Sequence, residues 1–323
     1  MTRSSLRTAA LAVAAAAALG AARQDQQVFR GLGDLVRIFV TVTDRDGRLV
    51  TDLTQDDFEI RDEGDLQAIT LFDNTPRPIR LVVMLDVSGS MEGNLRLLRD
   101  SAQELFVRLR AEDLARVGTF GREIVISPTF TRDVDALRAA LPTTILTDSP
   151  TPLWRALEDA MAAFDDENPE RRVVLVLSDG KDTGPVRFGD RYSSQFDVID
   201  RAREDDVMIY AIGLRSRGAR PMPPMIGRGG LSAMLTADLP DPGLARAALE
   251  TGGGYAEIRG GEDLGAAFAR VADELHSQYL LGFPPPKRDG KVHEVEVEVS
   301  RRGLDTRARK SYVAPKSPMI AGR

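Results

Sequence analysis

The sequence predicts an α/β fold: a doubly wound, mostly parallel sheet, flanked by a β-sandwich-like domain that N- and C-terminal strands build together. Two continuous apolar runs, at residues 81–85 and 173–177, are typical of central parallel strands that helices cover on both faces. Helical and strand patterns alternate around and after these runs, which indicates right-handed crossovers between parallel strands. Both ends of the mature chain, in contrast, show strand patterns only.

Residues 1–22 are expected to be a secretory signal peptide. Arg3 and Arg7 precede a stretch of small and apolar residues over 8–22, and polar residues follow it. A basic start, an apolar run of about 7–15 residues and a small-residue cleavage site make up such a peptide. The alternatives are a first helix of the domain or a membrane anchor, but the run is shorter than the roughly 20 residues that span a bilayer. We therefore expect an exported protein, periplasmic or secreted, with no stable membrane span after cleavage.

Residues 28–78 are expected to form the N-terminal β segment. Residues 36–43 alternate and are rich in β-branched side chains, and a turn cluster follows them. Short strands are expected at 58–60 and 68–72. Two prolines indicate a linker at 74–78, because proline denies both helix and ladder hydrogen bonds.

Residues 79–277 are expected to form the α/β domain. After the first buried strand, leucine and alanine at positions 95, 98, 102, 105 and 109 are spaced three and four apart, which predicts a helix. The remaining patterns predict strands at 117–120, 124–127, 207–212 and 254–258, and helices near 134–141, 153–164, 196–205, 244–251 and 264–276.

Residues 278–315 are expected to form the C-terminal β segment, with strands at 278–283, 292–300 and 307–313. The strict alternation over 292–299 indicates a strand with one wet face. Neither terminal segment has enough strands for a core of its own, because two or three strands are marginal. We therefore expect the two segments to pack together, with the α/β domain inserted between them.

The composition restricts the chemistry of the chain. It has 323 residues, a net charge of −6, no cysteine and two histidines. Disulfides, thiolate metal sites and a cysteine nucleophile are excluded, as is a three-histidine zinc site. The mild acidity argues against nucleic acid as a partner. We expect His276 to complement or cap a helix end and His293 to be an edge-strand side chain.

A set of oxygen-bearing side chains follows the predicted strands. Asp86, Ser88 and Ser90 come directly after the first buried strand, Asp179 comes after the second, and Thr151 stands at the start of a helix. Open α/β sheets bind ligands at the carboxyl ends of their strands. Hard oxygen ligands suit a small divalent cation such as Mg²⁺. Taken alone, serines that begin a helix are usually caps.

The complete set resembles the metal-ion-dependent adhesion site of von Willebrand factor type A domains, over about residues 79–276. The resemblance implies a Rossmann-like sheet in which the strands that end at Asp86 and Asp179 lie side by side. It also implies a divalent cation, Mg²⁺ or else Mn²⁺ or Ca²⁺. Ser88, Ser90 and Thr151 would offer hydroxyls to it, and the two aspartates would act directly or through water. The flanking strands resemble von Willebrand-related proteins described from acidobacteria.

The chain departs from the family's pattern just before the threonine. Glycines are more usual there, whereas this chain has Asp148-Ser149-Pro150. Asp148 would add a carboxylate near the site, and Pro150 stiffens the loop. Asp182, shortly after the second strand, is expected to be a solvated loop residue and not a ligand.

These features predict an exported, metal-dependent protein-binding or adhesion module that recognises an acidic group of a partner protein. Two carboxylates nearly neutralise a divalent cation, and a helix that begins near Ser90 would point its positive end at the site. An open metal position should therefore attract a partner's carboxylate. We expect no enzyme, because hydrolysis also needs a base and no histidine is near the set, although a carboxylate could serve. The alternatives are a scaffold with a stabilising metal, and a metal-dependent hydrolase or enzyme accessory subunit.

A long insertion at residues 214–243 follows the predicted strand at 207–212 and would emerge on the metal face. Its start is rich in proline, and Met222, Met225 and Met234 would offer adaptable apolar contacts to a partner. The alternative is a long loop without a role.

Overall fold

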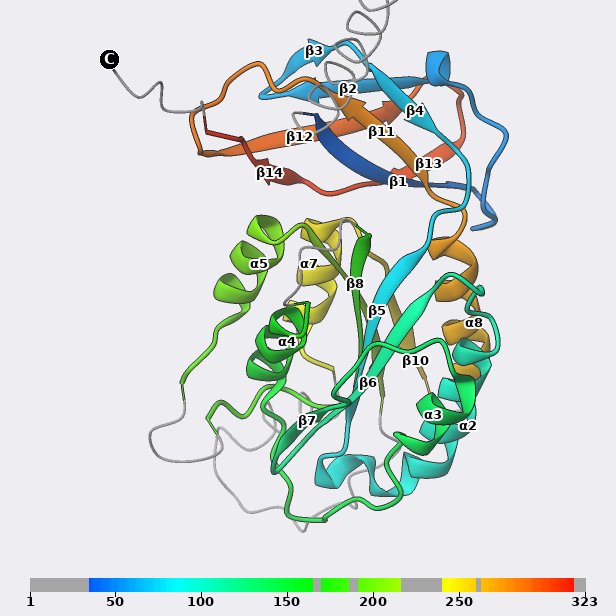
Figure 1. Ribbon diagram of the computed structural model, residues 1–323, viewed down its shortest axis with the longest axis vertical. Helices are drawn as coiled ribbons and strands as arrows, with labels where there is room; N and C mark the ends of the chain where they lie inside the picture. Colours follow the sequence, from blue (N-terminus) through cyan, green and yellow to red (C-terminus); the bar gives the residue numbers. More distant parts are fainter. Residues whose placement is uncertain (1–34, 165–169, 186–190, 216–239, 260–262, 317–323) are drawn as a thin grey trace, which may run out of the picture.

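The computed structural model describes residues 35–164, 170–185, 191–215, 240–259 and 263–316. The signal peptide expected at 1–22 and most of the insertion expected at 214–243 lie outside these ranges. The described chain forms an α/β body and, above it in Figure 1, a β domain of two smaller sheets. Among the described residues, no helix combines the length and the apolar character that crossing a membrane requires.

The α/β body is built on a six-stranded sheet with the order β10-β9-β8-β5-β6-β7. Its strands pair in parallel, except that β7 runs antiparallel to β6. Every residue of β5 is buried, as the apolar run at 81–85 predicts for a central strand. The doubly wound, mostly parallel sheet is thus confirmed. The strands are β5 (Ile79–Asp86), β6 (Leu114–Phe120), β7 (Ile124–Ile126), β8 (Arg171–Ser178), β9 (Val207–Leu214) and β10 (Tyr255–Ile258).

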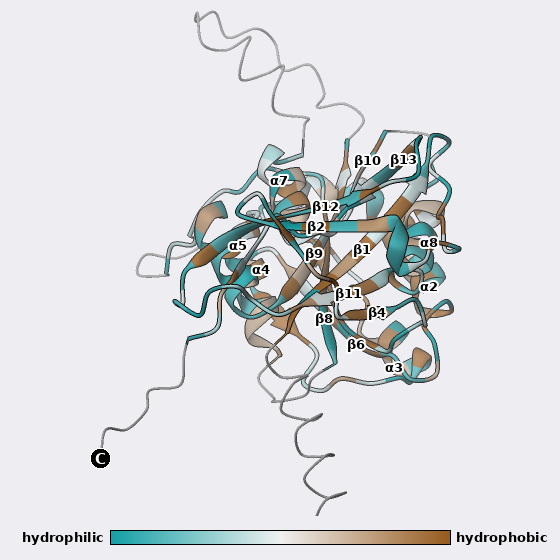
Figure 2. Ribbon diagram, turned by 90° about the horizontal axis from the view of Figure 1, so that it is seen from above, coloured by the Kyte–Doolittle hydropathy of each residue, from teal (hydrophilic) through white to brown (hydrophobic). Residues whose placement is uncertain are grey.

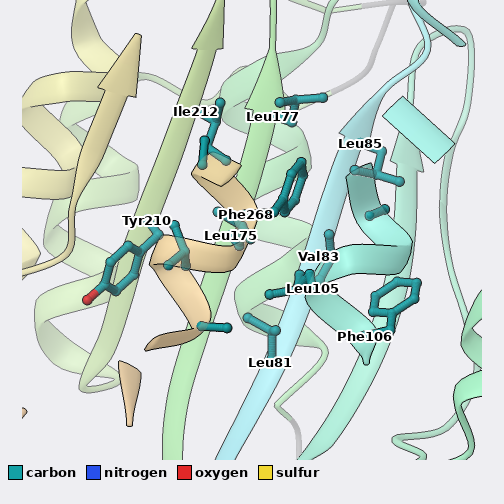
Figure 3. Close-up of a cluster of buried hydrophobic side chains, with 14 of the residues drawn as sticks. Leu81, Val83, Leu85, Leu105, Phe106, Leu175, Leu177, Tyr210, Ile212 and Phe268 are labelled. Atoms are coloured by element: carbon teal, nitrogen blue, oxygen red, sulfur yellow. The ribbon is translucent and has the colours of Figure 1, made fainter. Parts of the chain in front are cut away.

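Helices cover both faces of this sheet (Figures 1 and 2). Alternate side chains of β5 point to opposite faces, so Leu81, Val83 and Leu85 join one core and Val82 and Met84 join the other. Figure 3 shows the first core, where these β5 side chains meet side chains of α2 and α8. One face carries α2 (Leu95–Phe106), α3 (Val134–Ala139) and α8 (Leu264–Leu275), and the other carries α4 (Leu153–Ala162), α5 (Gln195–Glu204) and α7 (Pro242–Thr251).

The first helix begins later than predicted. A 3₁₀ turn, η2 (Gly89–Asn94), lies between β5 and α2, so no α-helix begins near Ser90. Gly93 and Asn94 are weak helix formers, which is consistent with an α-helix that starts only at Leu95. The predicted stripe is correct at its centre, where Leu98, Ala102 and Leu105 are all fully buried, but Leu109 lies beyond the end of α2 at Phe106.

The β domain consists of two antiparallel sheets, with the orders β13-β1-β11-β4 and β14-β12-β2-β3. β1, near the N-terminus, lies between two C-terminal strands, and β12 lies beside β2. The sandwich-like domain built from both terminal segments is therefore confirmed. Its elements are β1 (Val36–Asp44), a 3₁₀ turn η1 (Gln55–Asp57), β2 (Phe58–Asp62), β3 (Asp65–Gln67), β4 (Leu71–Asp73), β11 (Tyr279–Phe283), β12 (Val292–Val299), β13 (Leu304–Arg307) and β14 (Ser311–Val313).

Three details of this domain differ from the predictions. The strand expected at 307–313 is two strands, because the chain passes from one sheet to the other after β13. The strand expected at 68–72 begins only at Leu71, as β4, and a further strand that was not predicted, β3, precedes it at Asp65–Gln67. Glu63 and Gly64, both with positive φ, make a tight hairpin turn that starts β3 at Asp65. His293 is a buried residue of an inner strand, because β14 pairs on the outer side of β12.

A buried polar network joins the β domain to the α/β body. Glu274, at the end of α8, accepts hydrogen bonds from Tyr210 in β9, at 2.6 Å, and from Thr41 in β1, at 3.1 Å. Arg307 of β13 forms an ion pair with the same carboxylate. Gln278, which follows α8, donates to Thr41 and Tyr210. One carboxylate thus collects donors from both parts of the molecule.

Replacing Glu274 should therefore destabilise the whole chain. The variant Glu274→Ala leaves the Arg307 guanidinium and two hydroxyls without their acceptor, and we expect the free energy of unfolding to fall by about 2 kcal/mol. Asp273→Ala is the matched control, because Asp273 is the preceding residue of α8 and makes only an exposed pair with Arg108 at 3.7 Å. Differential scanning calorimetry should show a lower midpoint for Glu274→Ala alone. Equal midpoints of the two variants would contradict the role of the network.

Candidate metal centre

The paired ends of β5 and β8 bring the predicted site together. The two strands are parallel neighbours, and Leu85 is in register with Leu177, so the chain continues from both into the same edge of the sheet. Asp86 is fully buried there. Its carboxylate accepts the Ser88 N–H at 2.8 Å and the Ser178 hydroxyl at 2.5 Å. Ser178 therefore positions the first aspartate from the second strand, a role that the sequence alone did not reveal.

The two serines of the first loop connect the aspartates. The Ser90 hydroxyl donates to Oδ1 of Asp179 at 2.7 Å, and the Ser88 and Ser90 hydroxyl oxygens lie 3.1 Å apart. Ser88 and Asp179 are buried, whereas Ser90 is exposed. Ser90 thus connects Ser88 with Asp179, and the connected oxygen groups reach solvent at Ser90.

Thr151 reaches the same edge from the loop before α4. It is buried, and a Cβ atom added to Gly180 would lie 3.2 Å from its Oγ1, so the hydroxyl faces the residue after Asp179. Its backbone is held by Thr183, since the Thr151 N–H donates to the Thr183 hydroxyl at 3.0 Å and the Thr183 N–H donates to the Thr151 carbonyl at 2.9 Å. All five predicted site residues therefore lie at one edge of the sheet.

Gly89 permits the close approach of two loops at this edge. A Cβ atom there would lie 1.9 Å from the carbonyl oxygen of Thr147, and the Gly89 N–H donates to the Ser149 carbonyl at 3.1 Å. The Ser149 hydroxyl in turn accepts the Arg122 N–H at 2.6 Å. Asp148, the departure noted in the sequence, is exposed. The segment that replaces the usual glycines is thus held against the first loop by backbone and hydroxyl hydrogen bonds.

Asp182 differs from the expectation of a solvated loop residue. It is half-buried, and its carboxylate accepts the Trp154 N–H of α4 at 3.4 Å and the Gly184 N–H at 2.9 Å. Burial raises the pKa of this carboxyl group above its ordinary value. Backbone donors at the start of α4 explain why it is half-buried there, so it supports the helix that Thr151 precedes.

The electrostatics of the edge favour a bound cation. The pKa of Asp86 is raised to about 7, mainly by burial and also by the charge of Asp179, and hydrogen bonds from Ser178 and Ser88 oppose the shift. A divalent cation beside the two carboxylates would remove this penalty. The donor set of two carboxylates and three hydroxyls contains only hard oxygen atoms, so it fits Mg²⁺.

Three solved structures to which this chain is similar share little of its sequence. An aerotolerance-related membrane protein from Bacteroides fragilis is 14% identical, with a TM-score of 0.44, over 61% of this chain and 98% of that chain. A von Willebrand factor type A protein from Catenulispora acidiphila is 12% identical, with a TM-score of 0.46, over 80% of this chain and 74% of that chain. The pilus adhesin SpaC from Lactobacillus rhamnosus GG is 10% identical, with a TM-score of 0.44, over 80% and 43%. A comparison with curated protein sequences gave no match.

A family comparison matches the first part of the α/β body. The family model of the von Willebrand factor type A domain matches residues 81–181, the stretch that runs from β5 past the end of β8 and contains all five site residues. The closer resemblance to the acidobacterial proteins stays a prediction. Over residues 81–181 the chain is thus similar to the von Willebrand factor type A domain, and these residues lie in the doubly wound α/β body.

Proposed function

We propose that the chain is an exported protein-binding module that recognises an acidic group of a partner protein through a divalent cation. The observation that carries this proposal is the convergence of Asp86, Ser88, Ser90, Thr151 and Asp179 at one edge of the sheet. Domains of this family often bind a divalent metal. Export rests on the signal-peptide pattern at residues 1–22.

The partner's contribution follows from charge and accessibility. Asp86 and Asp179 together balance a divalent charge, while hydroxyl ligands add none. The cation therefore keeps an affinity for one further hard, anionic oxygen. Ser90 is exposed although Asp86 is fully buried, so the site is reached from solvent on the side of Ser90. A carboxylate that projects from a partner protein is the ligand that best suits such an opening.

A non-enzymatic role agrees with the positions of the histidines. His276 pairs with Asp113, which immediately precedes β6, whereas Asp86 is in register with the last residue of that strand. His276 thus lies at the opposite edge of the sheet, and His293 lies in the β domain. Hydrolysis at the cation would have to use a carboxylate as its base. The scaffold and the hydrolase remain the rival functions.

Metal binding should depend on the two aspartates. We expect isothermal titration of the full chain with Mg²⁺ or Mn²⁺ to show one site, and Asp86→Asn and Asp179→Asn to lose it, because each removes an anionic ligand. Asp148→Asn is the matched control, since this neighbouring carboxylate is exposed and lies outside the contacts of the site. Unchanged affinity in both aspartate variants, or equal loss in the control, would reject the assignment.

The affinity for the cation should decrease as the pH is lowered. Asp86 has a pKa of about 7, so protons compete with the metal below that value, and each further pH unit should weaken binding about tenfold. Titration of Mn²⁺ between about pH 5.5 and 8.5 measures this slope. An affinity that is constant across this range would contradict the buried aspartate as a ligand.

The metal-free protein gives an independent check of the same group. Because the pKa of Asp86 is raised in the folded state, the free energy of unfolding should fall as the pH rises from the ordinary aspartate pKa of about 4 toward 7. Asp86→Asn should remove this part of the slope, since the amide stays neutral. Denaturant titrations in chelator at two pH values give the comparison.

Partner binding should require the cation. The immobilised full-length protein should retain a carboxylate-bearing partner in the presence of Mg²⁺ and release it when a chelator is added. The immobilised Asp179→Asn variant should not retain the partner. Retention that ignores the chelator would favour the scaffold. A turnover that disappears in both Asp86→Asn and Asp179→Asn would favour the hydrolase.

A further inference from the structure

A second group of ionisable side chains lies in the β domain, at the other end of the molecule from the oxygen-lined edge (Figure 1). Asp62 ends β2, Glu63 forms the turn after it, and His293 is the second residue of β12. One ligand atom from each of the three lies within 4.8 Å of the others. Asp62 and His293 are buried, whereas Glu63 is exposed, so the group is reachable from solvent on one side.

The two nitrogens of the His293 ring face different partners. Nδ1 lies 3.1 Å from Oδ1 of Asp62, and Nε2 lies 3.3 Å from Oδ1 of Asp289. Metal-bound histidines usually hold a carboxylate on the ring nitrogen that does not bind the metal, which fixes the ring and its tautomer. Asp289 occupies that position here. The arrangement therefore offers a group of candidate ligand atoms, and also a carboxylate on the second ring nitrogen that would fix the imidazole.

Negative charge dominates this part of the domain. Three carboxylates, those of Asp62, Glu63 and Asp289, surround a single imidazole. The Tyr312 hydroxyl donates to Oδ2 of Asp62 at 3.2 Å, and its pKa is raised first by burial and then by these negative charges. The backbone N–H of Lys291 donates to Oδ1 of Asp289 at 3.0 Å and lowers the pKa of that carboxyl group. A single protonated imidazole would leave the carboxylates in excess, and a divalent cation would balance them.

We propose that Asp62, Glu63 and Nδ1 of His293 form a second metal site, for a transition-metal ion of the zinc type, with Asp289 holding the ring from its other side. Zinc binds nitrogen and oxygen ligands at about 2.0–2.2 Å in a tetrahedron, so neighbouring donors lie about 3.3 Å apart. The 3.1 Å between Nδ1 and Asp62 is close to this spacing. Imidazole suits zinc and its neighbours, whereas Mg²⁺ prefers oxygen alone. The two sites should therefore select different metals.

Such an ion would tie together the two ends of the chain. His293 and Asp62 are separated by 231 positions along the sequence, and β2 and β12 belong to the two segments between which the α/β body is inserted. A link between distant positions restricts the unfolded chain, as a disulfide does. The chain has no cysteine with which to make one. Metal bound at this position would thus stabilise the β domain.

The test uses the tag-free full chain, with Zn²⁺ measured against a competing chelator and Co²⁺ followed by its visible absorption. We expect one Zn²⁺ to bind in the presence of excess Mg²⁺ and to raise the unfolding midpoint by several degrees. His293→Gln should lose this binding, and Glu63→Gln should weaken it at least tenfold. Asp179→Asn should keep it, because the oxygen-lined site is separate.

His276→Gln is the matched control, since the other histidine of the chain is also buried and pairs with a single carboxylate, that of Asp113, at 2.7 Å. It should retain Zn²⁺. Should His293→Gln fail to fold, Glu63→Gln decides the question, because this side chain is exposed. Absence of Zn²⁺ binding in the wild type would overturn the proposal in favour of a histidine that only forms hydrogen bonds with the carboxylates. Full binding in Glu63→Gln, or equal loss in His276→Gln, would also overturn it.

Discussion

The parallel pairing of β5 with β8 is the constraint on which the rest of the molecule depends. Both strands need apolar side chains on both faces, which requires helices on each side and produces the two cores of the α/β body. The same pairing brings Asp86 and Asp179 to one edge of the sheet, where both strands end and polar loops follow. The fold and the site therefore have one cause. A change of register between the two strands would separate the aspartates and disrupt both cores at once.

Without a metal, the buried carboxylates of the site lower the stability of the folded state. Asp86 sits in a fully buried position beside another carboxylate, and three hydroxyl or backbone donors at this edge bond to the two carboxylates without neutralising them. Stability and function thus oppose each other at a single residue: the apolar surroundings that exclude water from Asp86 are also what would make a cation bind strongly there. Gly89 allows this compact arrangement, since any side chain would meet the Thr147 carbonyl.

Much of this could be predicted from sequence because the relevant signals are local. Continuous apolar runs identify the central strands, and the five site residues stand at strand ends and a helix start that those runs define. Other features depend on residues far apart in the chain. Ser178 supports Asp86 across the strand pair, and β13 and β14 lie in different sheets because of what they pair with, which no local pattern records. His293 is buried because it lies on the same face of β12 as Val295 and Val297, and β12 is an inner strand only because β14 pairs beside it, which the local pattern does not record.

The contacts between the β domain and the α/β body include a buried polar network, beside the packing of Phe39 against the α/β core. Two chain crossings, near Ile79 and Gln278, already hold the β domain next to the α/β body, so the interface does not need a large apolar area. What it needs is a fixed orientation. A carboxylate that accepts from β1, β9 and β13 together satisfies its donors in one arrangement only, whereas apolar contacts would tolerate sliding. Glu274 lies on α8, and α8 packs on α2, the helix that follows the candidate metal loop. Because these elements are rigid and contiguous, the orientation of the β domain and the position of that loop are set by the same packed helices.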